Sequence, residues 1–132
     1  MSQEMFWLIL TTLMTSLFWV PYVLNRMAVR GIVGSMANPT PDARPHAAWA
    51  ERSKQAHGNA IENLAIFAAL VLAVEVLKVN NALTATACAV YFWVRLGHFI
   101  VYTAGIPVVR TLAFLAGWAV QVVLALALLG VL

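Results

Sequence analysis

Two series of polar side chains recur at helical spacing inside hydrophobic segments of this chain. One series is spaced by four, four and three residues, and the other by three and four: Glu51, Gln55, Asn59 and Glu62, then Arg95, His98 and Tyr102. Residues with such spacing lie on one face of a helix. An ionisable side chain at the centre of a bilayer costs about 2.5–3.5 kcal/mol on insertion scales. We therefore expect the two faces to meet, within the chain or across subunits, around a polar cavity open to the cytoplasm.

Two interpretations of these polar faces remain open. In the first, Glu62 and Arg95 form a structural ion pair that fixes the register of two helices. In the second, the side chains bind a ligand with carboxylates, because the fork of an arginine matches carboxylate geometry and Glu62 is suited to hold an ammonium group. The residues expected to build only a structural polar interior are Glu51, Arg52, Gln55 and Arg95. No metal site is expected, because the three histidines lack ligand-like spacing.

The composition indicates that the elements carrying these residues lie in a membrane. Of 132 residues, 63% are hydrophobic and 10% are charged, whereas a soluble domain carries about 25% charged residues. The net charge of +3 is scattered and gives no indication of nucleic-acid binding. Since a spanning helix takes about 20 mostly apolar residues, we predict an all-α fold, an integral membrane four-helix bundle with a single domain over residues 1–132. The four helices are expected at about residues 5–26, 45–78, 82–104 and 109–131.

The connections between the predicted helices differ in length. Residues 25–46 are polar and rich in glycine and proline, so we predict a long loop there. Residues 80–81 and 104–107 predict two tight turns. If the second helix starts near Pro45, a favourable first-turn residue, it has about 33 residues and a length of roughly 50 Å. Its first turns are therefore expected to project beyond the hydrocarbon core, which is roughly 30 Å thick.

The distribution of lysine and arginine predicts the orientation. One side of the membrane is expected to carry six of these residues and the other only Lys78; the six are Arg26, Arg30, Arg44, Arg52, Lys54 and Arg110. Positive residues accumulate on the cytoplasmic side, so both termini are expected on the non-cytoplasmic side. The residues before the first hydrophobic run include Glu4 and no Lys or Arg. We expect that run to remain as a membrane helix rather than act as a cleaved signal.

The run Glu-Arg-Ser-Lys-Gln-Ala-His-Gly-Asn-Ala-Ile-Glu at residues 51–62 resembles a family pattern. Together with Ala37-Asn38-Pro39 and the second polar series, it looks like the MAPEG family, the membrane-associated proteins in eicosanoid and glutathione metabolism. The resemblance extends over nearly the whole chain. The chain looks like a divergent bacterial-type member of that family, which implies a place in a bacterial inner membrane. It implies a homotrimer that binds glutathione between subunits near the cytoplasmic membrane face and acts on lipophilic electrophiles.

The resemblance also assigns roles to individual residues. The implied glutathione-binding side chains are Arg30, Asn59, Glu62, His98, Tyr102 and Arg110. Arg110, with Thr111 beside it, would stabilise the thiolate as the catalytic pair. A nearby cation and a hydroxyl donor lower the pKa of a thiol, and the thiolate is the nucleophile. Glutathione would thus be a co-substrate, although the residues fit another low-molecular-weight thiol as well.

This sequence departs from the family pattern at several positions. Gln55 stands where the pattern has an arginine, Gly58 where the prostaglandin E synthase branch has another, and Phe114 where that branch has a tyrosine. The segment from Tyr102 to Arg110 is one residue shorter than in that branch. The loss of two cations keeps open a second interpretation, in which the chain is a non-catalytic membrane protein of the same fold that binds lipid or thiol.

A third interpretation is a four-helix small multidrug transporter. Those proteins need a carboxylate buried in the first helix, and here that helix has no charged residue after Glu4.

Overall fold

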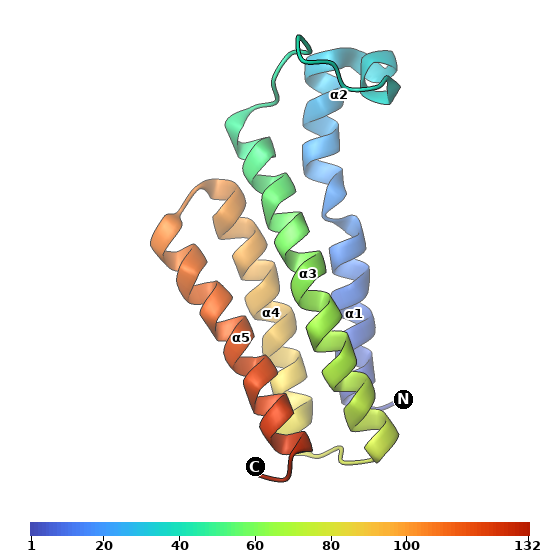
Figure 1. Cartoon of the computed structure of the whole chain (residues 1–132), viewed down its shortest axis with the longest axis vertical. Helices are drawn as coiled ribbons and strands as arrows, with labels where there is room; N and C mark the ends of the chain where they lie inside the picture. Colours follow the sequence, from blue (N-terminus) through green and yellow to red (C-terminus); the bar gives the residue numbers. More distant parts are fainter.

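The computed structural model describes all residues, 1–132, and consists only of helices and their connections. The five helices, in chain order, are α1 (Gln3–Leu17), α2 (Trp19–Met36), α3 (Ala48–Leu77), α4 (Ala82–Ala104) and α5 (Pro107–Leu128). Helices α1 and α2 together form the first of four segments that are long and apolar enough to cross a membrane. The predicted all-α membrane bundle is confirmed, and both chain termini lie at the same end of it (Figure 1).

The first membrane segment is broken between α1 and α2 at Phe18. Pro21 lies three residues beyond the break. Proline has no backbone N–H, and its ring clashes with the carbonyl four residues earlier, which here belongs to Leu17. The helix therefore ends before the proline-affected turn and restarts at Trp19. The expected single helix over residues 5–26 is in this respect wrong, because Pro21 interrupts the segment rather than ending it.

The predicted loop over residues 25–46 is also shorter than expected. Helix α2 continues to Met36, so only residues 37–47 connect it to α3. Gly31 takes a left-handed conformation with φ 73° and ψ 169°, which kinks the end of α2 without terminating it. Glycine allows this conformation because it has no Cβ. The three prolines of the connection all lie beyond the kink.

Helix α3 is the longest element and begins at Ala48, three residues after the predicted start at Pro45. At its other end, Lys78 adopts a left-handed conformation with φ 56°, and its N–H donates to the carbonyl of Glu75. Val79 N–H donates to the carbonyl of Val74 over 3.2 Å. These two bonds satisfy the last carbonyls of the helix. The upper end of α3 extends beyond the α4–α5 turn (Figure 1).

Helix α4 is fixed at both ends by local hydrogen bonds. Asn81 and Thr84 form a reciprocal capping box at its N-terminus. Gly105 ends it in a left-handed conformation with φ 81°, and Pro107 occupies the first turn of α5, where a missing N–H costs nothing. The short turn makes α4 and α5 antiparallel neighbours. Arg52 of α3 donates from Nε to the carbonyl of Thr103 over 3.1 Å, which ties α3 to this turn.

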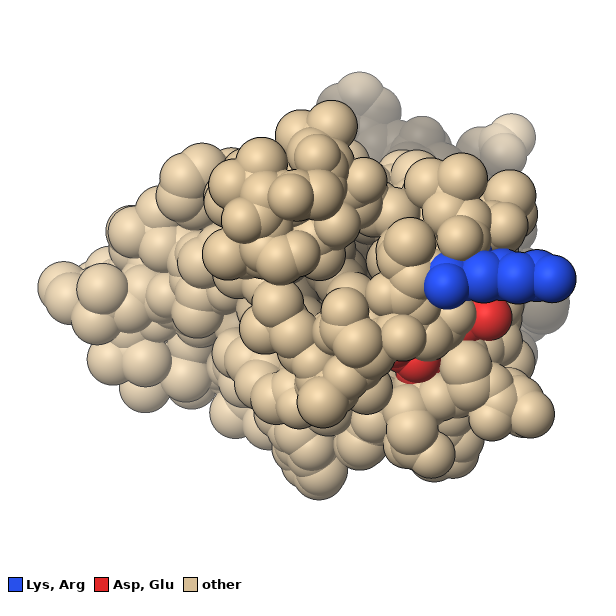
Figure 2. All heavy atoms as spheres, turned by 90° about the horizontal axis from the view of Figure 1, so that it is seen from below, with Lys and Arg blue, Asp and Glu red and all other residues tan.

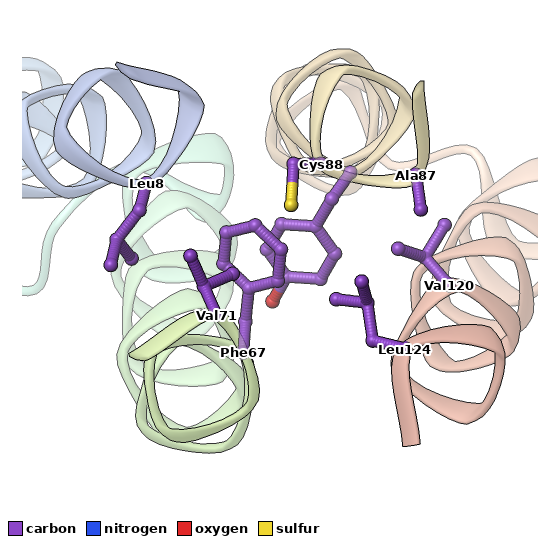
Figure 3. Close-up of a cluster of buried hydrophobic side chains, with 8 residues drawn as sticks. Leu8, Phe67, Val71, Ala87, Cys88, Val120 and Leu124 are labelled. Carbon is purple, nitrogen blue, oxygen red and sulfur yellow. The ribbon is translucent and has the colours of Figure 1, made fainter. Parts of the chain in front are cut away.

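The lower half of the bundle is closed by a cluster of buried hydrophobic side chains, called here the lower cluster. It comprises Leu8, Phe67, Val71, Ala87, Cys88, Tyr91, Val120 and Leu124. Helices α1, α3, α4 and α5 all contribute side chains to it (Figure 3). The rings of Phe67 and Tyr91 stack with centroids 3.8 Å apart. In lipid, such tight packing rather than hydrophobic burial drives helix association.

The end of the bundle that carries the termini has few charges. Seen from below, the surface is almost free of charged side chains (Figure 2). Glu4 is buried and accepts a hydrogen bond from the hydroxyl of Thr84, and Glu75 accepts bonds from Ser2 and Asn80. The carboxylates at this end are thus held by neutral donors. Lys78 is the only lysine or arginine in this part of the chain.

Candidate functional site

The cleft that concerns function lies between α3, α4 and α5 in the upper half of the bundle. Its volume is about 240 Å³, and its lining residues are Asn59, His98, Tyr102, Arg110, Thr111 and Phe114. Five of these six were predicted as site residues from sequence. The antiparallel arrangement of α4 and α5 brings the C-terminal turns of α4, with His98 and Tyr102, next to the N-terminal turns of α5, with Arg110. The cleft is therefore built from helices rather than from flexible loops.

Arg110 and Tyr102 form the mouth of the cleft. The guanidinium carbon of Arg110 lies over the ring of Tyr102, 4.6 Å from the ring centroid. The hydroxyl of Tyr102 donates to Oε1 of Gln55 over 3.1 Å. A cation over an aromatic face is attracted by the ring quadrupole, so the tyrosine holds the arginine at the opening. Thr111 beside it donates its hydroxyl to the carbonyl of Pro107 over 3.2 Å.

His98 forms the buried wall of the cleft and is 2% exposed. Its ring lies 5.6 Å from that of Tyr102 and 6.4 Å from that of Phe114, measured between centroids. Its Nδ1 has no hydrogen-bond partner within the chain. Buried polar atoms are nearly always hydrogen-bonded in proteins. The ring of His98 therefore forms part of the cleft wall, while its Nδ1 is buried and unsatisfied by any group of the chain.

Arg95 lies beneath the cleft and does not line it. It is 2% exposed, and its Nη2 donates to Oδ1 of Asn59 over 2.6 Å. Gly117 of α5 packs against it, since a Cβ at that position would lie 3.4 Å from Cδ of Arg95. The guanidinium is thus enclosed by three helices, with an amide oxygen as its nearest polar partner.

Two further amides extend this polar region toward the middle of the bundle. Nδ2 of Asn63 donates to the carbonyl of Asn59 over 2.9 Å, and Nε2 of Gln121 lies 3.3 Å from the carbonyl of Asn63. We call Asn59, Asn63, Arg95 and Gln121 the polar interior. Neither Asn63 nor Gln121 was predicted to have a role. The available signals were the four-residue spacing of Asn63 from Asn59 and the isolation of Gln121 in an apolar helix.

Two predicted glutathione-binding residues lie outside the cleft. Glu62 is exposed on the outer face of α3. The considered ion pair between Glu62 and Arg95 is not formed within the chain, where the one close contact between a basic nitrogen and a carboxylate joins His46 and Glu51. Arg30 lies on α2 and donates from Nε to the carbonyl of Arg44 over 2.9 Å, so it braces the α2–α3 connection.

The four residues that the sequence predicted as structural polar residues inside the bundle are only partly buried. Arg95 is buried, Arg52 is half-buried, and Glu51 and Gln55 are exposed. Residues 51–55 lie in the first turns of α3, level with the end of α4, which Arg52 and Gln55 reach through hydrogen bonds with Thr103 and Tyr102. Glu51 pairs instead with Nδ1 of His46 over 2.7 Å, within the same end of the chain.

The arrangement suits an anionic ligand beside an apolar one. Arg110 supplies a cation, while His98 and Tyr102 supply polar ring atoms and Asn59 an amide. Phe114 gives one wall apolar character, and the following turns of α5 expose Leu115 and Trp118 toward the surrounding membrane. A polar molecule is thus able to enter from the cation-rich end while a lipophilic one approaches along α5.

Comparison with known proteins agrees with this architecture. A model of the MAPEG family matches residues 5–130, which is nearly the whole chain. No curated protein and no solved structure matches the chain.

Proposed function

Since the chain belongs to the MAPEG family, we propose that it is a membrane-embedded, glutathione-dependent transferase or peroxidase that acts on lipophilic electrophiles. The family includes glutathione transferases and peroxidases. The observation that carries the proposal is the cleft in which Arg110, Tyr102, His98 and Asn59 converge from three helices.

The charges of the cleft fit a thiol tripeptide. Glutathione carries two carboxylates and becomes more negative when its thiol ionises. Arg110 offsets part of that charge at the mouth of the cleft, and Thr111 offers a hydroxyl beside it. A thiol with pKa near 8.5 is largely protonated at neutral pH, and a nearby cation lowers that pKa. In this proposal Arg110 stabilises the thiolate, while Asn59, His98 and Tyr102 bind the peptide part.

The reaction then needs only a lipophilic partner with a leaving group or a weak O–O bond. In a transferase reaction the thiolate sulfur attacks an electrophilic carbon and the leaving group departs with the bonding electrons. The thiol proton passes to solvent. In a peroxidase reaction two glutathione molecules are oxidised to the disulfide, and a hydroperoxide is reduced to an alcohol and water. Both reactions use an acceptor that reaches the cleft along Phe114.

The proposal includes assembly as a homotrimer with the sites between subunits. One stripe of α3, exposed at every position except half-buried Gly58, follows alternating spacings of four and three residues: Glu51, Gln55, Gly58, Glu62, Ala65, Ala69, Leu72 and Val76. This alternation is that of a helix-packing seam, and small residues allow close approach in membranes. Glu62 lies on this stripe at membrane depth, where exposure to lipid is costly. A second copy that covers α3 removes that cost and brings Glu62 and Arg30 toward a neighbouring cleft.

A non-catalytic protein of the same fold is the alternative, favoured by one observation. Gln55 accepts the hydroxyl of Tyr102 at the mouth of the cleft, where the family pattern has a cation. A site with less positive charge holds a thiolate less strongly. Such a protein would bind lipid or thiol without turnover.

The test is calorimetry of the detergent-purified protein with glutathione, followed by a conjugation assay with an aryl halide. The proposed function predicts saturable binding and release of halide in proportion to the conjugate formed. S-methylglutathione serves as the matched control, because it retains the peptide and has no ionisable thiol. Binding of both compounds without turnover supports the non-catalytic alternative. Absence of binding overturns both the enzyme and the thiol-binding proposal.

A further inference from the structure

The amide of Asn59 has a fixed direction in the folded chain. Its Oδ1 accepts from Nη2 of Arg95 over 2.6 Å and lies 3.4 Å from Nδ2 of Asn63. Asn59 also lines the cleft. An asparagine side chain has one carbonyl oxygen and one NH₂ group on opposite sides of the same carbon. With its oxygen engaged by donors from below, the group left to face the cleft is the NH₂.

The side chain of Arg95 is confined and has little room to adopt another conformation. It is 2% exposed, and α5 approaches it closely at Gly117, where a Cβ would lie 3.4 Å from its Cδ. The side chain of Asn63 is held in turn, since its Nδ2 donates to the carbonyl of Asn59 over 2.9 Å and its Oδ1 lies 3.4 Å from Nε2 of Gln121. The direction of the Asn59 amide is thus set by side chains from α3, α4 and α5 together.

The opposite orientation of the amide is disfavoured by the same contacts. If the amide were reversed, its NH₂ would face the guanidinium of Arg95, and two donors would meet without an acceptor. A buried donor left without a partner loses most of its hydration without compensation. Arginine has five N–H donors and no acceptor, so it imposes one orientation only. A glutamine in its place would offer both a donor and an acceptor and would leave either orientation of the amide possible.

We propose that Arg95 is a positioning residue, which acts through Asn59 and makes the floor of the cleft a hydrogen-bond donor. Asn59 then selects a ligand that presents a carbonyl or carboxylate oxygen at this point. The identity of the ligand in this inference rests on the proposed function. The orientation of the Asn59 amide rests only on the contacts within the chain. Sites built to pair a particular polar group discriminate strongly against ligands that leave it unpaired.

A double-mutant cycle on glutathione binding tests the coupling. Arg95→Met is expected to weaken binding about tenfold, the loss of one well-oriented hydrogen bond. In an Asn59→Ala background the same substitution is expected to change the dissociation constant by less than about twofold. Arg95→Met should lower thermal stability in both backgrounds, because the loss of packing around Arg95 does not depend on Asn59. Stability therefore does not distinguish a positioning role from a structural one, whereas binding does. Equal effects of Arg95→Met on binding in both backgrounds overturn the inference. If Arg95→Met fails to fold, Arg95→Gln replaces it, because glutamine stays polar but offers both a donor and an acceptor and so no longer imposes one orientation.

A second measurement separates this inference from the proposed function. In protein labelled with ¹⁵N-asparagine, the side-chain signal of Asn59 is identified by its absence in Asn59→Ala. Without any ligand, we expect Arg95→Gln to shift this signal and Arg110→Lys to leave it in place. An unshifted signal in Arg95→Gln overturns the inference. If wild-type protein binds no glutathione but the signal shifts as expected, the proposed function fails and the positioning role of Arg95 stands.

Discussion

The guanidinium of Arg110 rests on the ring of Tyr102, with its central carbon 4.6 Å from the ring centroid. The two residues come from different helices that are joined by one short turn. Such a contact contributes about 0.5–1 kcal/mol at an exposed site. Its larger effect is to keep the planar cation at the mouth of the cleft instead of in the solvent. The contact does not use the N–H groups at the rim of the guanidinium, which remain available to a ligand.

The first prediction concerns the catalytic contribution of Arg110. We expect Arg110→Ala to lower kcat by about tenfold or more and to change glutathione affinity by less than about threefold, because the cation is needed mainly by the thiolate. Glu62→Ala should instead weaken binding. Arg110→Lys, which keeps the charge, is the matched control. The measurement is stopped-flow ultraviolet absorbance of the bound thiolate together with steady-state kinetics.

An equal thiolate signal in wild type and Arg110→Ala would contradict this prediction. Arg110 would then be an ordinary positive residue at the cytoplasmic side of the membrane.

The second prediction is that both termini lie on the non-cytoplasmic side of the membrane. The end of the bundle with the termini carries Lys78 as its only lysine or arginine, as the sparse colouring in Figure 2 illustrates. Six others lie at or near the opposite end. Reporter fusions placed after Leu132 give the measurement: a periplasmic reporter should be active there and a cytoplasmic reporter inactive. The reverse pattern would reject the orientation.

The third prediction concerns the stripe on α3. Ala65 is exposed in the single chain, and in a trimer packed through this stripe a large side chain would not fit. We expect Ala65→Phe to dissociate the assembly, as measured by native mass spectrometry in detergent. Ala119→Phe, an equal change at an exposed position on α5, should leave the assembly unchanged. Intact trimers in both variants would mean that copies contact one another through another surface.

The fourth prediction compares two glycines of α4 and its C-terminal cap. Gly105 has φ 81°, and a Cβ there would lie 3.1 Å from the guanidinium of Arg52, whereas nothing lies within 4 Å of a Cβ at Gly97. Gly105→Ala should cost about 1–3 kcal/mol of unfolding free energy, because it strains the backbone and displaces Arg52. Gly97→Ala should be neutral or stabilising by up to about 1 kcal/mol. Thermal unfolding in detergent compares the two, and a lower stability of Gly97→Ala would contradict the argument.

Hydrophobicity alone predicted the four spans, because a bilayer demands long apolar segments whose backbone bonds are internal. The break at Phe18 could not be placed from sequence, since Pro21 is compatible with either an end or an interruption. Gly31 and Gly34 indicated a loop. In the structure only Gly31 leaves the helical conformation. The presence of two glycines in the sequence does not reveal which of them will break the helix.

The candidate site was predicted best where side-chain spacing decided the outcome. Asn59, His98 and Tyr102 lie on helix faces that point to one cleft, as their three- and four-residue spacing indicated. Glu62 fits the same spacing but lies on the exposed side of α3. A helical period assigns a face to a residue without showing which neighbour that face meets. The acceptors and donors of the polar interior depend on how α5 docks at Gly117, which is a tertiary property.

The lower cluster has a consequence for the membrane in which the protein lies. Arginine, asparagine and glutamine inside a bilayer tend to admit water, and water files conduct protons and small ions. Here that region ends at the stacked rings of Phe67 and Tyr91, followed by fully buried Val71, Cys88 and Leu124. The upper half of the bundle is thus a blind recess rather than a pore. Within one chain, the lower cluster separates the polar interior from the end of the bundle that carries the termini.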